Sequence, residues 1–216
     1  MSKLKEVESY LETLGYSQEE IKGIETNRVS LASAIMLYAH QGQKRINGEP
    51  YYYHPQRVYF SLRDFIGADD EGKNINEEWL DRYVFPLKGT QEVALLHDVV
   101  EDKDFTMSDI ESIYNELEFG EYFRKYIKDS LEIITHKKDA SYENYIEEVL
   151  LDKRASIVKF LDLHDNLNFL SLNEFGILEF ERCEKYLKYV KQINDKHHFI
   201  ENGRCYRELF KNKTNI

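Results

Sequence analysis

Residues that interrupt helices are scarce in this chain, and this scarcity limits the folds open to it more than any other feature. Only three prolines and ten glycines occur among its 216 residues. No segment shows the sustained alternation of apolar and polar residues that is typical of half-buried strands, whereas apolar residues recur at helical spacing. We therefore expect an all-α, multi-helix protein.

Polar residues and a proline indicate where several of these helices begin. Ser17 can cap a helix, Pro55 suits the first helical position, and Thr106 opens a sequence like a capping box. Thr90 should cap a helix that contains the stretch ALLHDVVED, residues 94–102. The helix of Pro55 should run to about residue 65, and further helices are expected over residues 3–14, 29–40, 120–135, 142–151, 154–170, 178–195 and 203–211.

One segment, residues 64–88, interrupts the helical pattern. It contains the polar run GADDEGKNINEEWLDRYVFPLK and the only tryptophan of the chain, Trp79. We expect a polar insertion in the helical domain. Two interpretations are open: a surface excursion anchored by Trp79 and Phe85, or a lid over a site, because loops often carry function.

Composition narrows the class of protein. The length of 216 residues and the 42% hydrophobic content fit one domain with its own core over residues 1–216. Cys183 and Cys205 have no metal-ligand spacing, which indicates a reduced, cytoplasmic chain. The N-terminal residues lack the apolar region of a signal peptide, and no apolar run is long enough to span a membrane.

The net charge bears on the partners of the protein. A charge of −11 argues against a nucleic-acid partner, because binding to a phosphate backbone depends on clustered Lys and Arg. A small phosphorylated ligand, held by a local cationic patch and a metal, is compatible with it. The oligomeric state is left open by the sequence.

The stretch ALLHDVVED combines an apolar run with four ionisable residues: His97, Asp98, Glu101 and Asp102. Burying unpaired charge is costly, so this cluster needs a counter-ion, a metal or water. If the stretch is helical, Asp98 shares a face with Asp102, and His97 shares one with Glu101. One helical turn cannot supply a complete metal shell, so we expect further ligands from elsewhere.

Two residues are candidates for those further ligands. His54 lies at a loop-to-helix junction, and Asp162 interrupts the apolar segment IVKFLDLHDNL. Together with His97 and Asp98 they would form a mixed nitrogen and oxygen shell suited to Mn, Fe or another divalent metal. The alternative is structural: His54 caps a helix and Asp162 pairs with Lys159.

Three stretches taken together resemble a known family. AHQGQKRINGEPYYYHP (39–55), ALLHDVVEDKDFT (94–106) and VKFLDLHDNL (158–167) are similar, in order, to the hydrolase domain of RelA/SpoT-type enzymes. That is an HD-domain family that degrades the alarmones ppGpp and pppGpp of the stringent response. The resemblance covers about residues 28–170, and C-terminal helices should follow over 178–211. It implies a stand-alone small alarmone hydrolase.

The resemblance also implies a role for each motif residue. The metal ligands, which normally hold Mn²⁺ (Fe, Co and Ni being alternatives), would be His54, His97, Asp98 and Asp162. An acidic pair that positions and activates the attacking water would be Glu101 and Asp102. Arg45 would lie against the guanine base, and Asn166 would contact the nucleoside. The products would be GDP or GTP and pyrophosphate, released from the 3′ position.

The sequence departs from the family pattern in two of these motifs. Ile46 stands where the family usually has a basic residue, and the family's Asp-Arg-Leu-His-Asn is replaced by residues 162–166, Asp-Leu-His-Asp-Asn. The metal and water residues are retained, but the base preference is open. An adenosine alarmone or another pyrophosphorylated nucleotide therefore remains an alternative substrate.

Positive charge for the phosphates of a nucleotide could come from the segment THKKDASYENY, residues 135–145. Lys137 and Lys138 precede a helix that should begin near Ser141, and a helix N-terminus favours an anion. A solvated loop before a capped helix is the alternative.

Three classes of function follow from these observations. The first is a metal-dependent alarmone 3′-pyrophosphohydrolase acting on a small nucleotide. The second is another HD-family phosphohydrolase, such as a nucleotidase or nucleotide pyrophosphatase, which would not need the element Gln43-x-Arg45-x-x-Gly48-Glu49-Pro50. The third is a catalytically silent nucleotide-binding module, which would not need Glu101 and Asp102.

Overall fold

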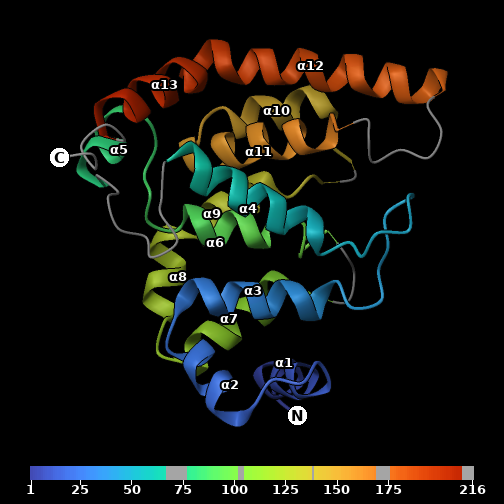
Figure 1. The fold of residues 1–216 in the computed structure, drawn as a ribbon, viewed down its shortest axis with the longest axis vertical. Coiled ribbons are helices and arrows are strands. Elements are labelled where there is room, and N and C mark those ends of the chain that lie inside the picture. The colour runs from blue at the N-terminus through green and yellow to red at the C-terminus, as the bar shows by residue number, and fades with distance from the viewer. Residues whose placement is uncertain (67–76, 102–104, 138, 169–175, 211–216) are drawn as a thin grey trace.

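The structure is a computed structural model that describes residues 1–66, 77–101, 105–137, 139–168 and 176–210 (Figure 1). Within these ranges the chain forms helices and no β-strand; the only bridge is an isolated antiparallel one between Lys44 and Pro50. The predicted all-α fold class is therefore confirmed. The helices are α1 (Lys3–Thr13), α2 (Gln18–Glu25), α3 (Arg28–Ala39), α4 (Tyr53–Phe65), α5 (Glu77–Tyr83), α6 (Thr90–Leu96), α7 (Met107–Glu116), α8 (Gly120–Tyr126), α9 (Lys128–Ile134), α10 (Tyr142–Val149), α11 (Lys153–Asn166), α12 (Ile177–His197) and α13 (Phe199–Phe210).

Several helices begin at the caps that the sequence predicts. The Ser17 side chain accepts from the backbone of Glu20, whose carboxylate accepts in return from the Ser17 backbone, so α2 opens with a capping box. Thr106 and Asp109 form the same arrangement at α7. Ser141 caps α10 by accepting from the Asn144 N–H.

Two predicted helix starts are wrong. Thr90 is the first residue of α6 rather than its cap, and its hydroxyl donates to the Pro86 carbonyl. The cap is Gly89, whose φ of 85° lies in the left-handed region and whose added Cβ would lie 2.1 Å from the Tyr126 carbonyl oxygen. Only glycine suits both conditions. Helix α4 begins at Tyr53, so Pro55 occupies its third position, still within the first turn that tolerates proline.

The stretch ALLHDVVED is not one helix. Helix α6 ends at Leu96, His97 is its C-cap, and the next residues form turns. The N–H groups of Val99 and Glu101 donate to carbonyls three residues earlier, at 3.0 and 3.2 Å. The predicted sharing of helical faces by His97 and Glu101 is therefore wrong, because tighter turns replace the helix after Leu96; the His97 ring bonds to the Ala94 carbonyl at this point.

Other boundaries differ by smaller amounts. The helix expected over 120–135 is divided into α8 and α9 at Ile127, where φ is −119°. Helix α11 ends at Asn166 instead of residue 170. Helix α12 is longer than expected and turns into α13 through His198, whose φ is 55°.

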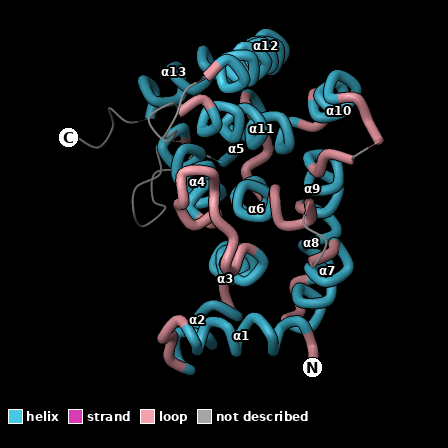
Figure 2. Tube along the Cα trace, turned by 90° about the vertical axis from the view of Figure 1, so that its right-hand side faces the viewer, coloured by secondary structure: helices cyan, strands magenta, loops and turns pink. Residues whose placement is uncertain are grey.

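The helices are stacked in layers from α1 and α2 at one end to α12 at the other (Figures 1 and 2). Helix α3 packs on α1, α2 and α6; α6 packs in turn on α4, α9 and α11; and α12 covers α11. Helix α6 is thus enclosed, and its side chains at Thr90, Glu92, Val93, Ala94, Leu95 and Leu96 are buried. The C-terminal end of α6, with His97, therefore lies in the interior between α4 and α11.

The second half of the 64–88 segment belongs to the core. Leu80, Val84, Phe85 and Leu87 are buried, which agrees with Phe85 as an anchor. Residues 67–76 and the side chain of Trp79 lie outside the described residues, so a lid in this segment stays a prediction.

Candidate metal centre and the adjoining pocket

Three segments that are distant in the sequence bring four polar side chains to one point. His54 comes from α4, His97 and Asp98 from the C-cap of α6 and the turn after it, and Asp162 from α11. The Nε2 atom of His54 lies 3.0 Å from Asp162 Oδ1 and 3.4 Å from Asp98 Oδ2. The Nε2 atom of His97 lies 3.3 Å from the same Asp98 oxygen and 3.8 Å from the same Asp162 oxygen.

The histidine rings present their Nε2 atoms to this point. His97 is 2% exposed, and its Nδ1 lies 2.9 Å from the Ala94 carbonyl, an acceptor that fixes the proton on Nδ1. The buried Nε2 of His97 makes no hydrogen bond. A buried imidazole nitrogen that makes no hydrogen bond but lies near two carboxylates is what a metal ligand would present. His54, His97 and Asp98 can place their ligand atoms within 4.8 Å of one another. Asp162 is outside this set of three, but its Oδ1 lies within 3.8 Å of both imidazole nitrogens.

The charges of the cluster depend strongly on one another. Burial would lower the pKa of His54, but Asp162, Asp165 and Asp98 raise this pKa to about 9. Burial would raise the pKa of Asp162, but Lys159 and the two imidazoles hold it well below its ordinary value. The carboxylates thus attract positive charge to this point. Two imidazole nitrogens and two carboxylate oxygens fit a divalent metal ion, with which the imidazoles would be neutral.

The two oxygens of Asp162 have different partners. Its Oδ2 lies 2.8 Å from the Lys159 ammonium, and both side chains are largely buried. Its Oδ1 faces the imidazoles and accepts from Asn166 Nδ2 at 2.7 Å. The structural alternative for Asp162, an ion pair with Lys159, is therefore present together with the metal-site geometry.

Sequence reasoning missed two residues that hold the candidate ligands. The Tyr51 hydroxyl donates to Asp98 Oδ2 at 2.9 Å, whereas the run Tyr51–Tyr53 indicates either packing or a ring that stacks on a base. Asp165 Oδ2 lies 2.7 Å from His54 Nδ1, although its motif position marks only a departure from the family. A carboxylate that accepts from the outer nitrogen of a histidine orients the ring toward a metal.

Glu101 lies beside the cluster, on an open pocket. The pocket is lined by Gln43, Lys44, Tyr51, Asp98 and Glu101. The Glu101 carboxylate accepts from the His136 backbone N–H at 3.3 Å. Partial desolvation and the nearby charge of Asp98 raise the pKa of Glu101 above that of an ordinary glutamate. A carboxylate with a raised pKa takes up a proton more readily, as a general base must.

The other site residues that the sequence predicts either lie around this pocket or fall outside the residues that the structure describes. The contact between His136 and Glu101 brings the loop that carries Lys137 to the edge of the site, where Lys137 is exposed. Asp102 and Lys138 lie outside the described residues, so their predicted roles are untested.

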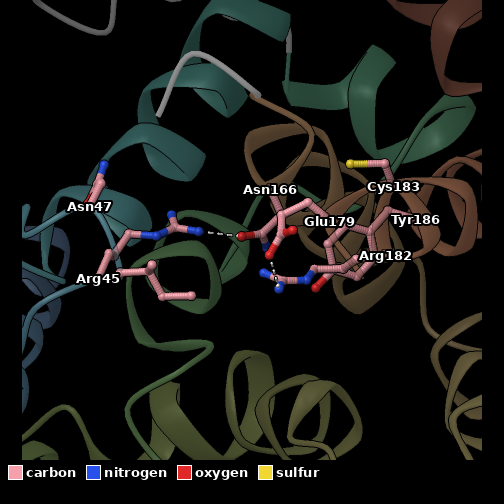
Figure 3. A pocket seen from close by; sticks show the side chains of 8 residues that line it. Arg45, Asn47, Asn166, Glu179, Arg182, Cys183 and Tyr186 are labelled. Atoms are coloured by element: carbon pink, nitrogen blue, oxygen red, sulfur yellow. Dashed lines mark hydrogen bonds and ion pairs between the residues drawn. The ribbon is translucent and has the colours of Figure 1, made fainter. Parts of the chain in front are cut away.

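Arg45 and Asn166 lie in direct contact at a second opening (Figure 3). Arg45 donates to Asn166 Oδ1 at 2.5 Å and to Asp165 Oδ2 at 3.2 Å. The opening is lined by Arg45, Ile46, Asn47, Asn166, Glu179, Arg182, Cys183 and Tyr186. Helix α12 therefore supplies a wall that the three motifs did not predict.

A buried cluster of imidazoles and carboxylates beside a carboxylate with a raised pKa is typical of metal-dependent hydrolases. Comparisons with known proteins narrow this class. No protein-family model matches the chain. The chain is 32% identical over 136 residues to guanosine-3′,5′-bis(diphosphate) 3′-pyrophosphohydrolase of Aquifex aeolicus, and this match covers 61% of this chain and 16% of that protein. It is 31% identical over 148 residues to the bifunctional (p)ppGpp synthase/hydrolase SpoT of Escherichia coli, covering 66% and 18%.

A solved structure supports the same fold. It comes from work on a metazoan ortholog of SpoT that hydrolyses ppGpp and plays a role in starvation responses; the TM-score is 0.56 at 22% identity, over 84% of this chain and 94% of that one. The resemblance to RelA/SpoT-type ppGpp hydrolases is thus confirmed. The chain spans only 16% to 18% of the length of the two curated relatives named above.

Proposed function

We propose that this chain hydrolyses the 3′-pyrophosphate of ppGpp and pppGpp, releasing GDP or GTP and pyrophosphate. The observation that carries the proposal is the convergence of His54, His97, Asp98 and Asp162 on one buried point, beside Glu101. Two curated relatives whose names specify ppGpp hydrolysis are 32% and 31% identical to this chain over 136 and 148 residues, which supports the proposal.

These four side chains would hold one divalent metal ion, which we propose to be Mn²⁺. When bound, such an ion lowers the pKa of water and polarises phosphoryl oxygens. The protein's part is to fix the ligands. The Ala94 carbonyl orients His97, and the Tyr51 hydroxyl orients Asp98.

Proton transfer and substrate binding would fall to the surrounding residues. Glu101, together with Asp102, would position the attacking water and accept its proton, for which the raised pKa of Glu101 is suited. Arg45 and Asn166 would hold the nucleoside at the opening that they line. Lys137 and Lys138 would attract the phosphates from the loop next to Glu101.

A different nucleotide is the second candidate substrate, and one observation favours it. Ile46, which replaces a basic residue of the family, lines the same opening as Arg45 and is 80% exposed there. The cation that the family pattern places next to Arg45 is therefore missing, and Arg182 of α12 lines the same opening from the other side. Such a pocket would discriminate less between guanosine and adenosine alarmones, or would accept another pyrophosphorylated nucleotide.

We further propose one domain for residues 1–216 and a cytoplasmic location. Buried side chains from α1 to α13 join a single hydrophobic cluster, which supports the first proposal. Among the described residues, no helix combines the length and the apolar character that crossing a membrane requires.

The test is a substrate panel with purified protein and Mn²⁺. The panel contains ppGpp, pppGpp, their adenosine counterparts and 5′-nucleoside monophosphates, and the products are separated by anion-exchange chromatography. We expect GDP and pyrophosphate from ppGpp. Intact ppGpp together with hydrolysed 5′-monophosphates would replace the proposal with a nucleotidase.

The ligand assignment has its own test. Metal analysis of His97→Ala and Asp162→Ala should show loss of the bound ion, whereas His164→Ala, an exposed residue of the same motif, should retain it. Full occupancy in the first two variants would refute the assignment.

A further inference from the structure

A closed ring of polar contacts connects the candidate metal ligands to the candidate nucleotide contacts. Arg45 donates to Asp165 and to Asn166; Asn166 donates to Asp162. His54 completes the ring, with Nε2 3.0 Å from Asp162 and Nδ1 2.7 Å from Asp165. The ring therefore contains two proposed ligands, two proposed nucleoside contacts, and Asp165.

Asp165 is the member of this ring to which the family pattern gives no role. In the family motif its position is a histidine, and here the motif also lacks its arginine. A carboxylate accepts several hydrogen bonds at once and donates none. Asp165 accepts four hydrogen bonds. Its Oδ2 accepts from His54 Nδ1, from Arg45 and, at 3.2 Å, from Arg57 Nη2, and its Oδ1 accepts from Arg57 Nε at 2.7 Å.

The surroundings of Asp165 favour a fixed geometry. Its side chain is 9% exposed, against 2% for His54 and 22% for Arg45. Arg57 also pairs with Glu49, which anchors the outer side of the carboxylate to the loop before α4. Two guanidinium groups and an imidazole thus hold one buried carboxylate in place.

We propose that Asp165 is a positioning residue that orients His54 toward the metal and Arg45 toward the nucleotide. This inference rests on the proposed function. The Nδ1–H of His54 donates to Asp165, which leaves the Nε2 lone pair directed at the metal site. The same oxygen holds the Arg45 guanidinium beside Asn166, so one side chain aligns both halves of the site.

The experiment compares Asp165→Asn with the wild type and with Asp195→Asn, which removes the same charge from an exposed position on α12. Calorimetry measures the dissociation constant for Mn²⁺, and separately that for ppGpp in the presence of chelator. Loss of such an outer partner typically weakens metal binding by roughly 10- to 100-fold. We expect a loss of that size for Asp165→Asn, together with weaker ppGpp binding, and no change for Asp195→Asn.

A purely structural role predicts a different result. Asp165→Asn would then lower the melting temperature while leaving both dissociation constants of the folded protein at wild-type values, and this result would overturn the proposal. If Asp165→Asn does not fold, Asp165→Glu provides the test. It keeps the negative charge near Arg57 but displaces it from His54, so weaker Mn²⁺ binding is expected and unchanged binding would refute the role.

A double-variant comparison tests whether Asp165 affects nucleotide binding through Arg45. If Arg45 acts through its contact with Asp165, the effects of Arg45→Ala and Asp165→Asn on ppGpp binding should not add; additive effects would contradict the link.

The Mn²⁺ measurement needs no turnover, so it separates the role of Asp165 from the proposed reaction. A wild type that binds Mn²⁺ but leaves ppGpp intact would refute the proposed function, while the Mn²⁺ affinity of Asp165→Asn would still decide the role at His54.

Discussion

Replacing Asp162 with asparagine should destabilise the protein even when no metal is present. The Asp162 carboxylate lies 2.8 Å from the Lys159 ammonium, and the side chains are 4% and 13% exposed. The substitution keeps the size of the side chain but removes the negative charge. Lys159 would then remain in the interior without its counter-ion.

The size of this effect follows from the burial of the pair. Removing one partner of a buried ion pair costs about 3–5 kcal/mol, because the other charge stays desolvated. Lys159 also lies 5.3 Å from the centroid of the Tyr145 ring, a contact that stabilises a cation by roughly 0.5–2 kcal/mol. We therefore expect a loss of about 3 kcal/mol in the free energy of unfolding, near the lower limit of that range.

Urea unfolding followed by circular dichroism, in chelator, measures this loss. Glu143→Gln is the matched control, because it breaks an ion pair with Lys188 whose side chains are 57% and 56% exposed; it should cost at most about 1 kcal/mol. Adding Lys159→Met to Asp162→Asn removes the stranded charge and should restore part of the stability. If Asp162→Asn is no more destabilising than Glu143→Gln, the reasoning about this buried pair is wrong.

Three further predictions concern catalysis, binding and pH. The double variant Glu101→Gln and Asp102→Asn should fold, bind Mn²⁺ and bind nucleotide, yet turn over at least about 100-fold more slowly in steady-state assays; near-normal turnover would show that the pair is structural. Arg45→Ala should raise the Michaelis constant for ppGpp, and an unchanged constant would refute its contact with the base. Burial raises the pKa of Glu92 above its ordinary value, so the stability that it contributes is present at low pH and is lost as the pH rises from about 4.3 through the raised pKa. Glu92→Gln should remove this loss in urea unfolding at a series of pH values, and parallel curves for the two proteins would contradict it.

The sequence predicted the fold class and the convergence of the three motifs. Scarce helix breakers and capping residues such as Ser17 and Thr106 carry local information, and local information suffices for most helices. The contacts of His54 with residues of α6 and α11 were predicted from the resemblance. Spacing alone left the structural alternatives open, and Lys159 pairs with Asp162 as the alternative supposed.

The contacts that the sequence did not predict join residues far apart in the chain. Asp165 lies 111 residues from His54, and Tyr51 lies 47 residues from Asp98; no local pattern signals either pair. The wall of the Arg45 pocket comes from α12, beyond the motifs. The end of α6 at Leu96 was missed because the apolar residues Val99 and Val100 continue the helical pattern while the backbone changes to turns.

The most direct test of the account is a measurement of ppGpp cleavage by wild-type protein that has been stripped of metal and then supplied with Mn²⁺. Quenched samples are separated by anion exchange, and His54→Gln and Asp98→Asn are treated in parallel. If the four proposed ligand side chains hold the catalytic metal, the stripped wild type is inactive, Mn²⁺ restores the release of GDP and pyrophosphate, and neither variant recovers. Equal cleavage with and without Mn²⁺, or full recovery of either variant, would contradict a metal-dependent reaction at this cluster.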